Sequence, residues 1–491
     1  MRILAILLIF ACSGCVAQPS PIQKIAEQVS GENIKSNLYY LASDKLEGRL
    51  MASRGDTLAS NHVADWFRKQ GLNAPYENGK SYFQAIEATR FTEINTISFN
   101  GITYIEPDGL TLYAGESFRA DSIPVLLADF ANYDDWRINI PSMPLNGAAV
   151  IINSNLFSVA GELDNLEEVL KLKGVKLIIW SGPDAVNSVK RKKENYFLPN
   201  YVLPEVFSAR SPLPELSIVP ELLQKLLTTE QVTINKDGTY SKPGTRPYYL
   251  LSQKISILHN KQMEKVKAPN VIGLIKGTDP DANCIIFSAH HDHDGRNGDS
   301  IYYGAVDNAS GTAAIMEVAA LMNLAAKQGF RPKRNIVFAS FTGEERGLLG
   351  SFYFVANPLF PISKTHAVLN IDMLGRIDTL HADGRNPDTN YAYILVKDKL
   401  NRGLRKSLIQ ANESVKLTLD THYELPQYEQ RRIYGSDQYP FYEKGVPFIR
   451  IDCGFAKEYH KPQDTPDKIN YELLEKQTKL VFLTLWNLAN N

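Results

Sequence analysis

The sequence predicts an α/β fold, with a mostly parallel central sheet covered by helices on both faces and an inserted mixed α/β domain. From Ala268 onward, short and nearly continuous apolar runs alternate with longer helical patterns. Such runs are typical of strands buried on both faces, and the helices supply the crossovers that parallel strands need. In the middle of the chain, many prolines and shorter strand-like runs interrupt this pattern and indicate a separate module.

The composition is that of a globular protein and excludes some partners. The chain has 491 residues, of which 44% are hydrophobic and 22% are charged. This length fits about three compact units, or one large domain with an insertion. Since 53 basic residues face 54 acidic ones, the formal net charge is −1. A chain without a general positive field is a poor candidate for binding nucleic acid, so we expect no such partner.

Residues 1–17 predict an export signal. Arg2 precedes an apolar run at 3–11 that is too short to span a bilayer, followed by small residues. The sequence SGC at 13–15 resembles a lipobox, which would place a lipid on Cys15 and attach the protein to a membrane. We therefore expect a periplasmic or cell-surface lipoprotein. The alternative is cleavage after Ala17 and a soluble secreted protein. Beyond the signal, no apolar run is long enough to span a membrane.

Two cysteines, Cys284 and Cys453, remain after the signal segment. Two cysteines in so long a chain do not make a disulfide framework. Each lies at the end of an apolar, strand-like run, so we expect two buried thiols.

The pattern divides the mature chain into three segments. Residues 18–120 are expected to form the first part of the main domain, with helices over 30–72 and strands over 80–120. Residues 121–262 form the inserted module, and residues 263–491 complete the main domain. Within the insertion we expect strands at 148–152 and 175–180, a helix at 163–173 and a solvated basic loop at 190–194.

The last segment carries the clearest alternation of strands and helices. Its expected strands are 271–275, 284–289, 335–341, 367–371 and 446–451, and its expected helices are 311–327, 437–444 and 471–489. In open sheets of this class, ligands bind beyond the carboxyl ends of the strands. Polar residues that follow each strand are therefore the candidates for function.

The first candidates follow the strand CIIFSA, where the sequence reads HHDHD from His290 to Asp294. Alternate strand residues share a face, so His290 and Asp292 are expected to point the same way. A neutral imidazole can bind a metal while a carboxylate orients it. A polar surface loop explains this segment equally well.

Four further segments of the main domain contain the remaining candidate residues. Asp307 lies before a helix and could simply cap it. Glu344 and Glu345 follow the strand NIVFASF, and they could divide metal binding and proton transfer or be solvated. Asp372 ends an apolar strand, where an unpaired charge would be costly. His460 lies in a loop, where a single histidine usually has no special role.

Together these segments indicate a metal site. Imidazole and carboxylate ligands without cysteine suit Zn²⁺, with other divalent ions less favoured. Two histidines and three carboxylates are too many for one open tetrahedral site. Two Zn²⁺ ions that share a bridging carboxylate would use all of them, and such a pair can activate water and polarise a carbonyl group.

At this point the sequence resembles the zinc aminopeptidase and glutamate carboxypeptidase family, metallopeptidase family twenty-eight. The resemblance rests on SDKLEGR at 43–49, on the motifs described above and on GSDQYPFYEKGVP at 435–447. Residues 121–262 also resemble the protease-associated domain that is often inserted in these enzymes.

The resemblance implies a role for each candidate residue. His290 and Asp372 match ligands of one zinc, Glu345 and His460 match ligands of the other, and Asp307 matches the ligand that bridges them. The full ligand set argues against a relative that has lost its metals.

The same resemblance assigns the remaining roles. Glu344 matches the general base, and Asp292 matches the carboxylate that supports the site from behind. Because H-x-D occurs once in the cluster, it selects His290 over His291 and His293. Gly435 stands where an arginine often precedes Ser-Asp, which bears on specificity. The resemblance also implies a cis peptide bond between Asp307 and Asn308.

The resemblance implies a dizinc exopeptidase that acts on peptides, and we favour an aminopeptidase. One alternative is a glutamate-carboxypeptidase-type carboxypeptidase, which would need a basic pocket for a substrate carboxylate. Arg376 and Arg432 are candidates that the sequence cannot place. A second alternative is a non-enzymatic surface protein that binds partners through its inserted domain. The oligomeric state does not follow from the sequence.

Overall fold

The computed structural model describes residues 19–128, 138–153, 160–195, 198–203, 213–242, 246–279, 281–382 and 388–491. The predicted signal segment, including Cys15, lies outside the described residues. The chain forms two compact units, one made of Met1–Ile86 with Lys267–Asn491 and the other of Glu87–Val266. The chain passes from one unit to the other within two long strands, β1 (Phe83–Phe99) and β11 (Tyr248–Ile275).

The first unit is built on a mostly parallel sheet whose order is β18-β17-β19-β16-β12-β15-β11. Its further strands are β12 (Cys284–His290), β15 (Ile336–Phe341), β16 (Thr365–Ile371), β17 (Tyr391–Lys397), β18 (Thr418–Asp420) and β19 (Phe448–Asp452). Parallel pairing joins β12 to β15 and β16, β16 to β19, and β17 to β18, whereas β11–β15 and β17–β19 are antiparallel. A small hairpin of β13 (Gly295–Asn297) and β14 (Ser300–Tyr302) stands apart from this sheet.

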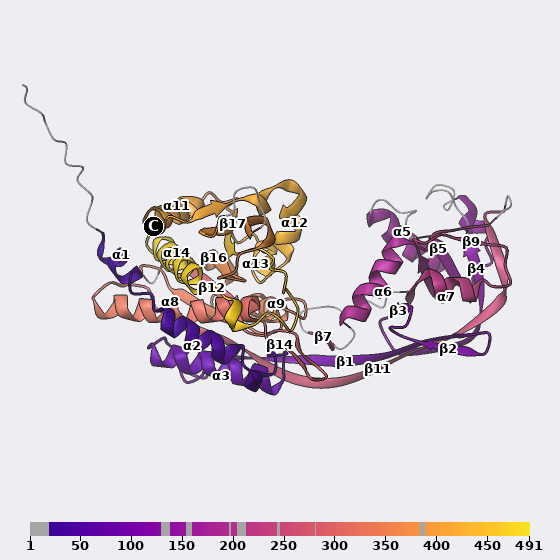
Figure 1. The fold of residues 1–491 in the computed structure, drawn as a ribbon, viewed down its shortest axis with the longest axis horizontal. Coiled ribbons are helices and arrows are strands. Elements are labelled where there is room, and N and C mark those ends of the chain that lie inside the picture. Colours follow the sequence, from indigo (N-terminus) through magenta and orange to yellow (C-terminus); the bar gives the residue numbers. More distant parts are fainter. Residues whose placement is uncertain are drawn as a thin grey trace, which may run out of the picture. The chain divides into compact units, whose positions relative to one another are not determined.

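Helices cover both faces of this sheet (Figure 1). Side chains of β12 alternate between two cores, with Ile285 and Phe287 in one and Cys284 and Ile286 in the other. The first core is closed by α1 (Pro21–Ala26), α2 (Gly31–Leu41), α3 (Arg54–Lys69), α8 (Gly311–Lys327), α11 (Leu404–Val415) and α14 (Tyr471–Asn490). The second is closed by α9 (Leu349–Ala356), α12 (Pro426–Tyr434) and α13 (Tyr439–Glu443).

Short turns complete the unit. They are η1 (Asp44–Leu46), η4 (Ala305–Ser310), η5 (Ile362–Lys364), α10 (Thr379–Ala382), η6 (His422–Glu424) and η7 (Pro466–Lys468). Contrary to the expectation that no apolar run after the signal is long enough to span a membrane, the segment Ala305–Lys327, which contains α8, passes this test of length and composition among the described residues. Because 78% of its apolar window is buried inside the protein, we regard α8 as a core helix.

The second unit contains its own mixed sheet. Parallel strands β4 (Phe118–Ala128), β5 (Ala149–Asn153), β6 (Leu177–Ser181) and β8 (Glu215–Ile218) lie in that order, and β3 (Leu110–Tyr113) joins antiparallel at the end. Strand β1 pairs with β2 (Ile102–Ile105) and β7 (Asn200–Val202). The other elements are η2 (Ile140–Ser142), α5 (Ala160–Leu172), α6 (Pro183–Asn195), α7 (Pro220–Leu226), β9 (Thr233–Ile234) and β10 (Tyr240–Ser241).

The structure confirms the expected fold class and most of the main domain's expected elements, but two expectations about the insertion differ. The second unit begins at Glu87 rather than at residue 121, because β2, β3 and the start of β4 pair with β1, β8 and β11 inside that unit. The basic run at 190–194 is not a loop but the end of α6, where it is mostly exposed. The resemblance of the insertion to a protease-associated domain stays a prediction.

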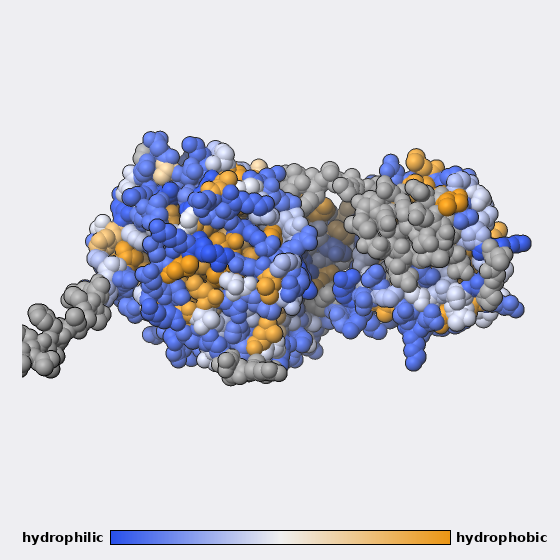
Figure 2. Space-filling model, turned by 90° about the horizontal axis from the view of Figure 1, so that it is seen from above, coloured by the Kyte–Doolittle hydropathy of each residue, from blue (hydrophilic) through white to orange (hydrophobic). Residues whose placement is uncertain are grey.

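The expectation about the two cysteines agrees with the structure. Cys284 and Cys453 are both free and buried. On the face shown in Figure 2, both units are mostly hydrophilic, and hydrophobic residues appear in small groups.

Candidate metal centre

The carboxyl ends of three neighbouring parallel strands place most of the predicted site residues together. His290 is the last residue of β12, Asp372 directly follows β16, and Glu344 and Glu345 follow β15 by a short turn. Because β15, β12 and β16 are adjacent and parallel, these side chains meet at one edge of the sheet. Asp307 comes to the same edge from η4, the turn that precedes α8.

The five predicted ligands form two groups that share Asp307. His290 Nε2 lies 3.4 Å from Asp307 Oδ1 and 3.3 Å from Asp372 Oδ1. His460 Nε2 lies 3.1 Å from the other Asp307 oxygen, Oδ2, and 3.2 Å from Glu345 Oε2. The two oxygens of one carboxylate therefore face two different histidines, as a bridging ligand would.

The donor set fits divalent cations. Asp307, Asp372 and Asp292 are each at most 4% exposed, and Glu344 and Glu345 lie beside them. So many buried carboxylates need compensating positive charge, because an unpaired buried charge is strongly unfavourable. Imidazole nitrogens and carboxylate oxygens at one point are the ligands that Zn²⁺ takes in hydrolytic sites.

The pKa values of the histidines reflect the same excess of negative charge. Burial by itself lowers the pKa of His460, but Glu345 and Asp307 outweigh it and raise the pKa to about 12. Burial also lowers the pKa of His290, but Glu344 and several neighbouring aspartates outweigh this effect and hold the pKa well above its usual range. A proton on each imidazole thus provides the positive charge that a bound cation would otherwise supply.

Glu344 stands beside the two groups rather than within them. Its carboxylate is 3.9 Å from His290 Nε2, and it lines a pocket next to the centre. Burial raises the pKa of Glu344 well above its usual range. The nearby His290 lowers this pKa, whereas the negative charge of Glu345 raises it further. A carboxylate placed next to the ligands, with access to the pocket, is suited to accept a proton from a water molecule.

Asp292 does not face the pocket. It is fully buried, and its carboxylate accepts hydrogen bonds from the backbone N–H groups of Glu344 (3.1 Å) and Glu345 (3.4 Å). Asp292 Oδ1 also lies 3.6 Å from His290 Nδ1. It thus orients a histidine and the two glutamates that follow β15, which is a positioning role.

Arg450 on β19 positions Asp372. Its Nη2 donates to Asp372 Oδ2 (3.1 Å) and its Nε donates to Asp452 Oδ2 (3.0 Å). Burial alone would raise the pKa of Asp372, but Arg450 and then His290 lower it to about 2. Asp372 therefore stays ionised, with one oxygen directed to Arg450 and the other to His290.

Three positioning residues were not identified from the sequence. Asp464 accepts hydrogen bonds from the backbone N–H groups of Val306 and Asp307, so it holds η4 in place. Arg49 donates to the carbonyl oxygens of His291 and Gly304, which adjoin the segments of His290 and Asp307. Arg450 acts as described above. Arg49 ends the SDKLEGR motif and Asp464 follows His460 in the same loop, but most of their partners are far away in sequence. The Asp307–Asn308 bond is cis, as expected.

The structure also brings together residues that the H-x-D argument set aside. His293 Nδ1 lies 2.8 Å from Glu345 Oε1, and His293, Asp307 and Glu345 are close enough to hold one ion. Asp294, Glu345 and His460 form another such group. Strand β12 ends at His290, so strand alternation could not place His293 or Asp294. His291 instead faces Ser340 Oγ (2.9 Å) and lies outside these groups.

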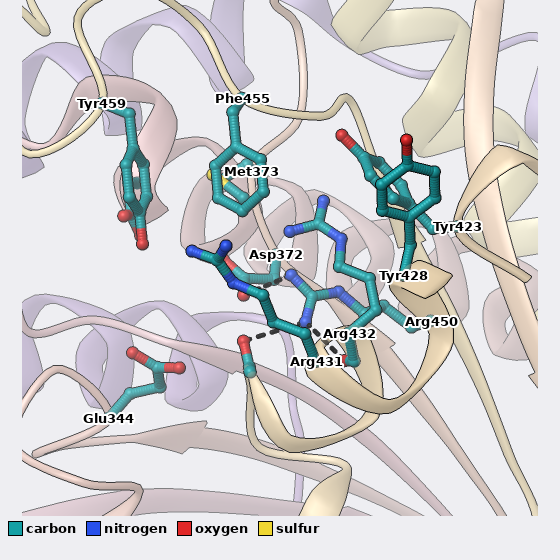
Figure 3. A pocket seen from close by; sticks show the side chains of 12 residues that line it. Glu344, Asp372, Met373, Tyr423, Tyr428, Arg431, Arg432, Arg450, Phe455 and Tyr459 are labelled. Carbon is teal, nitrogen blue, oxygen red and sulfur yellow. Dashed lines mark hydrogen bonds and ion pairs between the residues drawn. The ribbon is translucent and has the colours of Figure 1, made fainter. Parts of the chain in front are cut away.

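A pocket of about 420 Å³ opens beside the metal-binding groups (Figure 3). Its lining combines carboxylates, arginines and aromatic rings, namely Asp307, Glu344, Asp372, Met373, Tyr423, Tyr428, Arg431, Arg432, Gly435, Arg450, Phe455 and Tyr459. This volume lies within the range of about 300–1,000 Å³ that small-molecule sites have. The pocket could hold a few amino-acid residues next to the metal-binding groups.

The sequence comparisons agree with this arrangement. Residues 270–485 match the model of peptidase family M28. The matched segment contains His290, Asp307, the Glu344–Glu345 pair, Asp372 and His460. The resemblance noted from the sequence motifs is thereby confirmed for this part of the chain.

Curated relatives carry names from both branches of the family. The chain is 28% identical to a probable glutamate carboxypeptidase of Zea mays over 237 residues, which are 47% of this chain and 30% of that protein. It is 34% identical to the aminopeptidase NAALADL1 of Mus musculus over 148 residues, which are 30% of this chain and 19% of that protein. The matches thus span less than a third of these relatives.

Solved structures show the same fold. An aminopeptidase from Aneurinibacillus sp. strain AM-1 superposes with a TM-score of 0.57, at 17% identity, over 96% of each chain. A zinc aminopeptidase from Bacillus subtilis superposes with a TM-score of 0.54, also at 17% identity, over 94% of this chain and 96% of the other. These similarities confirm the α/β architecture of the described residues.

Proposed function

We propose that this chain is a zinc-dependent exopeptidase that binds two ions and removes N-terminal residues from peptides. The observation that carries the proposal is the position of Asp307 between His290 and His460, with one carboxylate oxygen facing each imidazole. Asp372 completes the group of His290, and Glu345, 3.2 Å from His460 Nε2, completes the other, so each ion would have three protein ligands and an open position.

Bound zinc would lower the pKa of water and polarise the carbonyl group of the scissile bond. The chain's own residues would manage the proton. Glu344 would accept a proton from the attacking water as the new C–O bond forms, and would deliver it to the leaving amine as the C–N bond breaks. Asp292, through the N–H groups of Glu344 and Glu345, would hold that carboxylate in position. This cycle returns Glu344 to its starting charge.

The acidic end of the pocket supports an aminopeptidase. A free α-ammonium group would be attracted to the carboxylates that line this end of the pocket, of which Glu344 is not a proposed metal ligand. A carboxypeptidase is the second candidate, because three arginines also line the pocket. A non-enzymatic binding protein would have no need for a complete set of buried metal ligands.

The N-terminal segment and the second unit carry separate proposals. From residues 1–17 alone we propose that the chain is exported and lipidated at Cys15. For the second unit, we retain the proposal of a protease-associated-like domain.

The function can be tested with one short peptide in four forms: free, N-acetylated, C-amidated and doubly blocked. Each form is incubated with and without a chelator, and the products are identified by mass spectrometry. We expect N-terminal residues to be released only when the amine is free, only without chelator, and with two zinc ions bound per chain. Trimming that requires a free C-terminal carboxylate would support the carboxypeptidase. No cleavage by zinc-loaded protein would contradict the proposal.

A further inference from the structure

Arg431 is a pocket arginine that has no side-chain partner among the described residues. It lies on α12 and lines the pocket, and its side chain is exposed. In the described part of the chain, no hydrogen bond or ion pair occupies its guanidinium group. Figure 3 shows this side chain extending into the pocket, on the side of Glu344 and Tyr459.

The other arginines near the pocket are already occupied. Arg432 Nη2 donates to Asp452 Oδ1 (2.6 Å), and its guanidinium stacks on Tyr423 and Phe455 at 4.2 and 4.3 Å from the ring centroids. Arg450 binds Asp372 and Asp452, as described above.

Arg376, which the sequence suggested as a candidate for binding a substrate carboxylate, also has partners. It contacts Glu458 and the carbonyl oxygen of Lys468, and it does not line the pocket. Among the pocket arginines, Arg431 is therefore the one available for a ligand.

The surroundings of Arg431 favour an anionic group of the substrate. The pocket has carboxylates at the metal-binding end and the aromatic rings of Tyr428, Phe455 and Tyr459 along its wall. Asp307 and Asp372 would be engaged by the metal ions, and Glu344 lies 3.9 Å from His290 Nε2, so among the described residues no pocket carboxylate is paired with Arg431. A guanidinium group matches a carboxylate with two parallel hydrogen bonds, which gives orientation as well as affinity.

We propose that Arg431 is a specificity residue that binds a carboxylate of the substrate, so that the preferred substrates are short peptides with a negative charge within reach of α12. The carboxylate could be the C-terminus of the peptide or the side chain of an aspartate or glutamate. This inference rests on the proposed peptidase function and adds the substrate class to it.

The test compares alanine di-, tri- and tetrapeptides as free acids and as C-terminal amides, together with amides in which one alanine is replaced by glutamate. The values of kcat/KM are measured for the wild type and for Arg431→Gln, which removes the charge and keeps most of the length. Arg431→Lys keeps the charge but loses the paired geometry. Arg54→Gln removes an exposed arginine outside the pocket and serves as the matched control.

At one or more peptide lengths, we expect the wild type to prefer the carboxylate-bearing peptide by about tenfold or more, mainly through KM. Arg431→Gln should lose most of this preference, Arg431→Lys should keep part of it, and Arg54→Gln should keep all of it. A preference lost on amidation identifies the C-terminal carboxylate, whereas one restored by glutamate identifies an acidic side chain. The preference should weaken as the salt concentration rises.

The outcomes separate the two proposals. If the wild type cleaves peptides but has no preference for any carboxylate, or if Arg431→Gln keeps the preference, the inference about Arg431 is wrong and the peptidase function stands. If the zinc-loaded wild type cleaves none of the peptides, both are wrong. As a second measurement, Glu344→Gln should bind the free acid more tightly than the amide in calorimetry, and adding Arg431→Gln should remove that difference.

Discussion

Arg49 offers a quantitative test of how the N-terminal segment supports the metal centre. Its side chain is fully buried and donates four hydrogen bonds to backbone carbonyl oxygens: Nε to His291 (2.7 Å), Nη1 to Leu41 (2.6 Å) and Tyr303 (2.8 Å), and Nη2 to Gly304 (2.9 Å). Burial lowers its pKa to about 10, so the group stays charged at neutral pH. One side chain thus joins the end of α2, the turn after β12 and the approach to η4.

Replacing Arg49 by Met keeps the apolar stem but removes all four donors. Hydrogen bonds to a charged group contribute about 1.5–3 kcal/mol each. Their simple sum overstates the loss, because the buried guanidinium itself carries a desolvation penalty and water can reach some of the carbonyl groups. Removing one partner from a buried charged network costs about 3–5 kcal/mol, and we expect the free energy of unfolding to fall by this amount.

Calorimetry can check this value. For a unit of this size, 1 kcal/mol corresponds to about 2–4 °C, so Arg49→Met should lower the Tm of the first unit's transition by about 10 °C. Zinc should also be lost faster to a chelator, since the segments of His290 and Asp307 are less firmly held. Arg68→Met is the control, because Arg68 is an exposed arginine that pairs with Asp65 and lies over the ring of Tyr82, and it should shift the Tm by less than about 2 °C. A shift below about 3 °C for Arg49→Met would refute the reasoning.

Two further predictions concern the proposed base and the response to pH. Glu344→Gln should keep its zinc while kcat falls by about 10²–10⁴-fold, as metal analysis and steady-state kinetics would show; turnover close to that of the wild type would exclude Glu344 as the base. His62 has its pKa lowered to about 4, mainly by burial, with Asp65 opposing. Between pH 6.5 and 4, the unfolded chain therefore binds a proton at His62 that the folded chain does not bind. The contribution of neutral His62 to the free energy of unfolding is fully present above pH 6.5 and is lost as the pH falls. From pH 7 to pH 5 the wild type should lose about 2 kcal/mol more than His62→Gln does, and equal losses in the two proteins would contradict the assignment.

Local pattern explains why so much of the main domain could be predicted. Buried parallel strands consist almost entirely of apolar residues, so the strands around His290, Glu344 and Asp372 were evident from the sequence. The topology of parallel sheets then brings their carboxyl ends together. Helix α8 was predicted with its observed bounds, Gly311–Lys327. By contrast, β17 and α11 were not predicted.

Long-range pairing explains where prediction stopped. The start of the second unit at Glu87 depends on which strands pair across the insertion. The residue pattern of a single strand does not indicate which other strand it pairs with. The same holds for Asp464, whose hydrogen-bond partners are about 160 positions away, and for Arg49, whose partners other than Leu41 are 242 to 255 positions away. His293 was set aside by a motif, yet the turn after β12 brings it to Glu345.

The sequence by itself determined the fold class, the order of strands and helices in the main domain, and the residue types of the metal centre, because buried strands and the polar residues that follow them are local features. The tertiary structure decided which groups have partners. Arg376 and Arg432 are paired with carboxylates, whereas Arg431, on the pocket wall, has no such partner in the described part of the chain. The physical reason is that pairing of charges depends on distances between segments far apart in the chain, and these distances exist only once the sheet and its covering helices have formed.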